Sequence, residues 1–160
     1  MLYLTILTNL NISTMSYVSA LYHLVFTTYL REPVINNDYR RRLYAIIASE
    51  IKSLKSKALI INGVQDHIHI LLSLHQTVAL SELVRHIKSK SSIWAKSSGF
   101  FPLFRGWEKE YGAFALSHTH KEAVYDYIRS QQQHHSIYTL DDEYNCLLRK
   151  AGLSLYTPKE

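Results

Sequence analysis

The chain has 160 residues, of which 47% are hydrophobic, with only five glycines and three prolines. A chain of this size buries about two-thirds of its unfolded surface, so the composition predicts one domain with a hydrophobic core and excludes a disordered chain. The net charge of +5 favours a polyanionic partner, and the single cysteine, Cys146, excludes a disulfide framework and indicates a reducing compartment, the cytoplasm.

The first fourteen residues are apolar, but they differ from a targeting or membrane segment. They contain no Lys or Arg, since the first basic residue is Arg31, and they are too short to span a bilayer. We interpret residues 1–14 as an N-terminal extension to a single domain at 15–160, with Met15 as an alternative start and no membrane association. An additional edge strand is the less favoured interpretation of this segment.

The next two elements are a strand and a helix. Residues 21–29 mix aromatic and β-branched side chains, which predicts a buried strand that ends before Pro33. Apolar residues then recur at helical spacing over residues 43–54, after the candidate N-caps at positions 36–38.

A pair of strands follows the first helix. The apolar segments 58–64 and 67–74 predict two adjacent strands that turn at Gln65-Asp66 or, as the less favoured alternative, at Asn62-Gly63. Apolar residues at helical spacing then predict a second helix over residues 79–97.

The second helix stops at Gly99, and residues 111–117 predict a fourth strand. The order β-α-β-β-α-β predicts an α+β protein with a ferredoxin-like (RRM-like) antiparallel sheet, two helices on one face and the other face open. Additional C-terminal helices are predicted at 119–134, which begins with a capping-box sequence, and at 139–152.

The strand at 67–74 begins with two histidines that flank one isoleucine. Side chains two residues apart in a strand share a face, so His67 and His69 project together, and two imidazoles on one face are able to supply part of a metal-ligand shell. For an isolated His-x-His, a polar stripe on a half-exposed sheet is the simpler interpretation. Asp66 is either an outer acceptor that fixes an imidazole tautomer or a turn cap, and the turn cap is favoured.

The predicted helix at 119–134 carries an amide in its apolar stripe. Gln131 falls on the same face as Val124 and Ile128, and a buried amide needs hydrogen-bonding partners. Tyr127 lies one turn earlier on an adjoining part of that face, whereas Tyr125 points away from it. A helical tyrosine is most often a core residue, so Tyr127 alone does not indicate a function.

Taken together, HIH at 67–69 and YIRSQ at 127–131 resemble the HUH endonuclease superfamily. The likeness is to the single-tyrosine transposases of small bacterial insertion sequences and of REP elements. It extends from Met15 to Tyr156 through YHLVFTTYLREPV, DHIHILL, LVRHIKSKSS, YGAFALS, YIRSQQQHH and DEYNCLLRKAGL. The resemblance implies a metal-dependent single-stranded DNA endonuclease and strand transferase that cleaves beside a DNA hairpin through a 5′-phosphotyrosine.

The same resemblance implies roles for particular residues. His67, His69 and the amide oxygen of Gln131 would bind one divalent metal ion, and Tyr127 would be the nucleophile. The family suggests Mg²⁺, whereas two imidazoles favour Mn²⁺ or another transition ion. One tyrosine holds one strand end, so we predict a homodimer, with the Tyr127 helix acting in trans by family analogy.

Two other functions stay open, a non-catalytic single-stranded nucleic-acid-binding module and an HUH nickase of the replication-initiator type. Basic residues on the two helices of the ferredoxin-like unit are predicted to contact DNA phosphates, with a solvated helical face as the alternative. They are Arg40, Arg41 and Arg42 on the first helix and Arg85, Lys88, Lys90 and Lys96 on the second, which is favoured.

Overall fold

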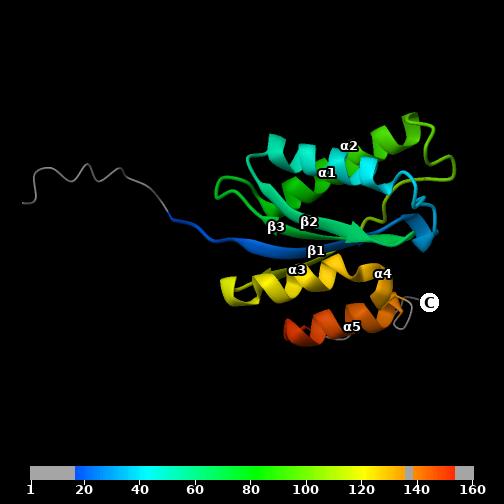
Figure 1. The fold of residues 1–160 in the computed structure, drawn as a ribbon. Helices are drawn as coiled ribbons and strands as arrows, with labels where there is room; N and C mark the ends of the chain where they lie inside the picture. Colours follow the sequence, from blue (N-terminus) through cyan, green and yellow to red (C-terminus); the bar gives the residue numbers. More distant parts are fainter. Residues whose placement is uncertain (1–16, 136–138, 154–160) are drawn as a thin grey trace, which may run out of the picture.

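A four-stranded antiparallel sheet lies between two layers of helices in the computed structural model, which describes residues 17–135 and 139–153 (Figure 1). The expected extension at residues 1–14 lies outside the described residues. The strands are β1 (Leu21–Thr27), β2 (Lys57–Gly63), β3 (His67–Ser73) and β4 (Gly112–Leu116), in the order β2-β3-β1-β4. This order confirms the predicted ferredoxin-like fold.

The helices α1 (Arg40–Ser53) and α2 (Leu80–Ser97) cover one face of the sheet (Figure 1). Their apolar stripes pack against the strands, so Ile47 and Ile87 are fully buried beside Phe26 of β1. The chain enters α1 through a short 3₁₀ turn, η1 (Tyr29–Arg31). None of the predicted caps at positions 36–38 is the N-cap of α1, which is Tyr39.

The second sheet face is covered as well, so the prediction that it stays open is wrong. The helices α3 (Lys121–Arg129), α4 (Gln131–His134) and α5 (Leu140–Lys150) lie on this side (Figure 1). The physical reason is that α3 and α5 are amphipathic and bury apolar side chains, Ile128 and Leu140 among them. With helices on both faces, the first six residues of β3 are all buried.

The single helix predicted at 119–134 is interrupted. A 3₁₀ turn, η2 (His118–His120), precedes α3, and the predicted capping box is absent because the Thr119 hydroxyl bonds the Ser117 hydroxyl instead. Ser130 separates α3 from α4, and its hydroxyl donates to the carbonyls of Asp126 and Tyr127. The capping box at Thr139 and Asp142 is present, as predicted.

The β2–β3 hairpin places the two histidines at the start of β3. It turns between Gly63 and His67, which confirms the turn at Gln65-Asp66 and excludes the alternative at Asn62-Gly63. Gly63 pairs with Ile68, and its backbone lies directly against the neighbouring strand. A Cβ at Gly63 would collide with the His67 carbonyl oxygen and lie 2.8 Å from the Cα of Ile68.

We therefore expect Gly63→Ala to lower the free energy of unfolding by about 3 kcal/mol, because neither backbone contact can move aside without disturbing β3. Gly99→Ala is the matched control. Gly99 has a φ of +74°, and a Cβ there meets no described atom within 4 Å, so its cost is only the left-handed backbone strain of about 1 kcal/mol. Urea denaturation measures both, and equal losses would contradict the predicted collision.

Candidate metal centre and active site

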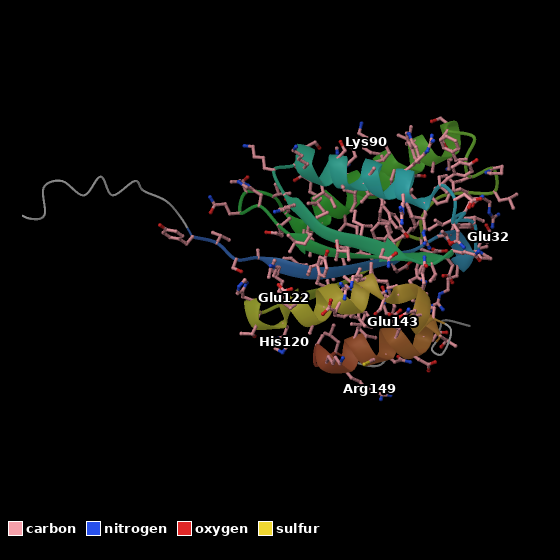
Figure 2. The ribbon with its side chains drawn as sticks, viewed as in Figure 1. Glu32, Lys90, His120, Glu122, Glu143 and Arg149 are labelled. Carbon is pink, nitrogen blue, oxygen red and sulfur yellow. The ribbon has the colours of Figure 1, made fainter. Side chains whose placement is uncertain are left out.

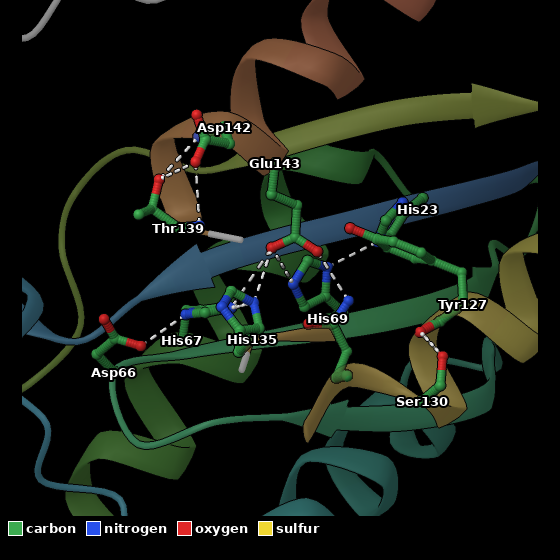
Figure 3. A network of polar contacts seen from close by, with 11 residues as sticks. His23, Asp66, His67, His69, Tyr127, Ser130, His135, Thr139, Asp142 and Glu143 are labelled. Atoms are coloured by element: carbon green, nitrogen blue, oxygen red, sulfur yellow. Dashed lines mark hydrogen bonds and ion pairs between the residues drawn. The ribbon is translucent and has the colours of Figure 1, made fainter. Parts of the chain in front are cut away.

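Four side chains of ligand type converge on the sheet face covered by α3, α4 and α5 (Figure 3). His67 and His69 come from β3, His135 follows α4, and Glu143 comes from α5. One ligand atom from each lies within 4.8 Å of all the others. His67 and His69 are 1% and 0% exposed, so the interpretation as a half-exposed polar stripe is wrong.

The carboxylate of Glu143 lies at the centre of the three imidazoles. Its Oε2 atom is 3.1 Å from Nε2 of His135, 3.3 Å from Nε2 of His69 and 3.7 Å from Nε2 of His67. Nε2 of His67 is also 2.9 Å from Nε2 of His135. Burial, reinforced by the Asp66 charge and opposed by His67, raises the pKa of Glu143 to about 7. The site thus favours a positive charge beside this carboxylate.

Partners outside the cluster hold the other ring nitrogens of the β3 histidines. Nδ1 of His67 donates to Oδ1 of Asp66 at 2.6 Å, which leaves Nε2 as the ring nitrogen directed at the cluster. Nδ1 of His69 lies 2.8 Å from Nε2 of His23 on β1, a buried histidine whose pKa burial holds well below its usual value. Both Nε2 atoms therefore face the same point.

The side chain of Asp66 is hydrogen-bonded to the imidazole of His67, as the alternative of an outer acceptor expects. Its backbone carbonyl, which accepts from the Thr28 amide at 2.8 Å, tethers the turn to β1, and its side chain is directed at His67. Burial alone raises the pKa of Asp66, but the hydrogen bond and charge of His67 outweigh it, and the pKa lies below its usual value. Asp66 is therefore a charged acceptor that fixes the His67 ring.

Asp66→Ala is expected to weaken divalent-ion binding by about 10–100-fold, because the His67 ring loses the partner that fixes its tautomer. Titration calorimetry with Mn²⁺ measures the change. Asp38→Ala, at an exposed aspartate before α1, is the control and should leave the affinity unchanged. Equal affinities for the two variants would show that Asp66 does not support the site.

Gln131, which is fully buried, borders the cluster on the side of Glu143. Its Nε2 donates to Oε1 of Glu143 at 2.8 Å. Its Oε1 is buried and has no hydrogen-bond partner among the described residues. An unsatisfied buried oxygen costs about 1–3 kcal/mol, and a cation would remove that cost.

Tyr127 lies beside the cluster and also at a pocket. Its ring centroid is 5.9 Å from that of His23 and 6.0 Å from that of His69, and both contacts are edge-on (Figure 3). Tyr127, His23 and Glu143 together line a pocket of about 1140 Å³ between β4, α3 and α5. Its other walls include Phe114, Leu116, Val124, Cys146, Leu147 and Lys150. Tyr127 and Glu143 therefore lie where this pocket meets the cluster.

Three members of this network were missed by the sequence analysis, namely His23, His135 and Glu143. Glu143 lies between Leu140 and Leu147 at helical spacing, so a carboxylate in the apolar stripe of α5 was the available signal. His135 belongs to the doublet in QQQHH, and His23 to a buried strand, but neither pattern alone indicates a ligand.

The basic residues of the second predicted helix are partly brought together. Arg85, Lys88 and Lys96 line a groove of about 480 Å³ along α2, which Arg105 and Lys109 also line, whereas Lys90 points outward (Figure 2). Nζ of Lys88 donates to the carbonyls of Lys109 and Glu110 at 3.0 and 3.3 Å.

The three arginines at the start of α1 do not line this groove. Arg40 bonds Asn37, Arg42 lies over the ring of Phe100, and Arg41 is exposed. Both α1 and α2 lie on the sheet face opposite the histidine cluster (Figure 1). DNA contacts by these residues stay a prediction. Within the described ranges, no helix combines the length and the apolar character that crossing a bilayer requires.

The fold and the site define a class, a ferredoxin-like α+β protein with a candidate metal centre and a tyrosine on one sheet face. The family described as "Transposase IS200 like" matches residues 16–131, more than half of the sequence. The chain belongs to this family of IS200-like transposases. His135 and Glu143 lie beyond the matched residues, and no curated protein matches the sequence at a significant level.

Two solved structures share the fold. One is a candidate transposase from Deinococcus radiodurans R1, with a TM-score of 0.58 and 21% identity over 73% of this chain and 95% of that one. The other is a REP-associated tyrosine transposase bound to a REP hairpin, with a TM-score of 0.58 and 15% identity over 91% of this chain and 90% of that one. At these identities the likeness establishes the fold alone.

Proposed function

We propose that this transposase cleaves and rejoins single-stranded DNA beside a hairpin, with Tyr127 as the nucleophile. The observation that supports this most directly is the position of Tyr127, whose ring lies against His23 and His69 at the border between the ligand cluster and the large pocket. A pure binding module has no need for a phenol placed beside convergent metal ligands.

The residues present fit a divalent cation. His67 and His69 would hold it through Nε2 and Gln131 through Oε1, and the buried, unpartnered Oε1 of Gln131 supports that assignment. When bound, the ion would supply Lewis-acid stabilisation of charge on the phosphate. Mg²⁺ or Mn²⁺ would serve, and the imidazoles favour Mn²⁺.

The reaction needs little else from the chain. The phenol oxygen of Tyr127 forms a bond to phosphorus, and the bond from phosphorus to the 3′ oxygen breaks. The proton lost by the phenol is balanced by the one gained at the 3′ oxygen, which leaves as a hydroxyl. The strand stays attached as a 5′-phosphotyrosine. A second 3′-hydroxyl then bonds to phosphorus, the bond from phosphorus to the Tyr127 oxygen breaks, and the phenol regains a proton, so the strands are joined without ATP.

The proposed partners are hairpin DNA and a second copy of the chain. A basic chain with a large pocket beside Tyr127 suits a single strand, and the REP-associated neighbour is bound to a hairpin. Moving an element with two ends requires two tyrosine nucleophiles and hence a homodimer. Tyr127 already contacts His69 of its own chain, so this contact needs no swap, and a trans arrangement stays a prediction.

The test is to incubate the protein with end-labelled strands taken from the imperfect palindromes that flank its gene, in the presence of Mn²⁺. We expect a detergent-resistant protein–DNA adduct that a chelator abolishes, and strand joining when a second 3′-hydroxyl end is added. Hairpin binding that survives chelation without any adduct would instead support the non-catalytic module. Adduct formation without strand joining would favour the nickase.

A further inference from the structure

We propose that Glu143 and His135 are two further ligands of the same cation. They would close a His₃–Glu site that holds α5 against the sheet in the DNA-free protein and prefers a four-coordinate ion of the Zn²⁺ class. The inference rests on the proposed function only for His67 and His69 as ligands. It differs from the proposed function at Gln131, which in this closed state orients the carboxylate of Glu143 instead of binding the ion.

Four of the six separations between the ligand atoms lie near those of a four-coordinate site, and all six are within 4.8 Å. Metal–ligand bonds of about 2.05 Å imply tetrahedral edges of roughly 3.3 Å between ligand atoms. The separations from Oε2 of Glu143 to the three Nε2 atoms are 3.1, 3.3 and 3.7 Å, and that from His67 to His135 is 2.9 Å. Three ligands are almost fully buried and His135 is half-buried, which is typical of a closed site rather than an open one.

Three of the four ligands are held by a neighbour that leaves one atom directed at the centre. Asp66 holds His67, His23 holds His69, and the amide of Gln131 holds Oε1 of Glu143, so that Oε2 faces the imidazoles. Such outer partners are the usual companions of first ligands in protein metal sites. A single carboxylate among three imidazoles also suits a doubly charged transition ion better than Mg²⁺.

The closed site has a consequence for α5. Besides Glu143 and the buried Leu140, contacts of α5 on the sheet side include the Arg31–Asp141 ion pair at 2.7 Å and the Tyr144 hydroxyl, 3.5 Å from the Val25 carbonyl. A cation bound by Glu143 and by the β3 histidines would attach α5 to the sheet more strongly than these contacts. Glu143 then occupies a ligand position that a DNA phosphate would otherwise take, so DNA and α5 compete.

The test uses the full chain and Co²⁺, whose visible absorption is intense in four-coordinate and weak in six-coordinate sites. We expect the intense spectrum for the unchanged protein. Glu143→Gln and His135→Gln should each lose it and weaken binding at least about 100-fold, because loss of an outer partner alone costs about 10–100-fold. Glu50→Gln is the matched control, since its carboxylate pairs with His86 at 2.7 Å outside the cluster.

Two measurements on the unchanged chain keep the inference testable if a variant unfolds. X-ray absorption of the Zn²⁺ form should give three imidazoles and one oxygen, and amide exchange over residues 140–150 should slow when Zn²⁺ is added. Two imidazoles, or a Glu143→Gln protein with unchanged affinity and spectrum, would overturn it. A site with two imidazoles together with a Tyr127-dependent adduct would contradict this inference and leave the proposed function intact. A His₃–Glu site without any adduct would contradict the proposed function and leave this inference intact.

Discussion

Tyr127→Phe is expected to abolish covalent attachment of the protein to a hairpin strand, lowering the rate of adduct formation at least about 10⁴-fold, a loss of the size seen when other covalent enzymes lose their nucleophile. The ring contacts with His23 and His69 need only the aromatic body of the side chain. Phenylalanine keeps that body and lacks the attacking oxygen. Single-turnover assays with labelled DNA in Mn²⁺ measure the change.

Tyr125→Phe provides the control. This substitution also removes a phenolic oxygen, but position 125 lies about 200° around α3 from position 127. It should leave the rate of adduct formation unchanged. An adduct that persists in Tyr127→Phe and disappears in Tyr125→Phe would show that Tyr125, and not Tyr127, is the nucleophile. Hairpin affinity should be similar for all three proteins, which separates loss of chemistry from loss of binding.

The second large effect is expected for His67→Asn. The change removes the Nε2 atom that faces Glu143 and His135, so affinity for Mn²⁺ should fall at least about 100-fold, more than the cost of losing an outer partner. Adduct formation should fall with it. Titration calorimetry and the single-turnover assay give the two values on the same preparation.

His86→Asn is the matched control for this variant. His86 also pairs with a carboxylate, that of Glu50, but it lies on α2 and belongs to no ligand cluster among the described residues. It should retain both metal affinity and adduct formation. Circular dichroism should show the same fold in both variants. If His67→Asn kept metal-dependent cleavage at the original rate, the histidine pair would not be the metal site.

The parts of the site that the sequence predicted are those governed by local periodicity. His67 and His69 share a face because strands repeat every two residues. Gln131 is buried as its place in the helical pattern predicted, although it begins α4 rather than continuing α3. The strand order followed from the alternation of strands and helices. These rules connect neighbours along the chain, and they hold here because the elements are long enough to show a clear period.

The parts that were not predicted depend on contacts between distant segments. Glu143 meets His69 only because α5 lies on the second side of the sheet, and no local pattern specifies that placement. The interruption at Ser130 was also missed, since the helical pattern runs through it without glycine or proline. The side chain of Ser130 caps carbonyls of α3 there, a local competitor of the helix that periodicity does not register.

The site combines residues on rigid inner strands with residues on helices that open more easily. His23, His67 and His69 lie on β1 and β3, the two inner strands, which are bonded to a neighbour on each side. Such strands open only when the whole domain unfolds, whereas peripheral helices open at much lower free energy. The phenol and Glu143 therefore belong to elements that can be repositioned while the imidazole pair keeps its geometry.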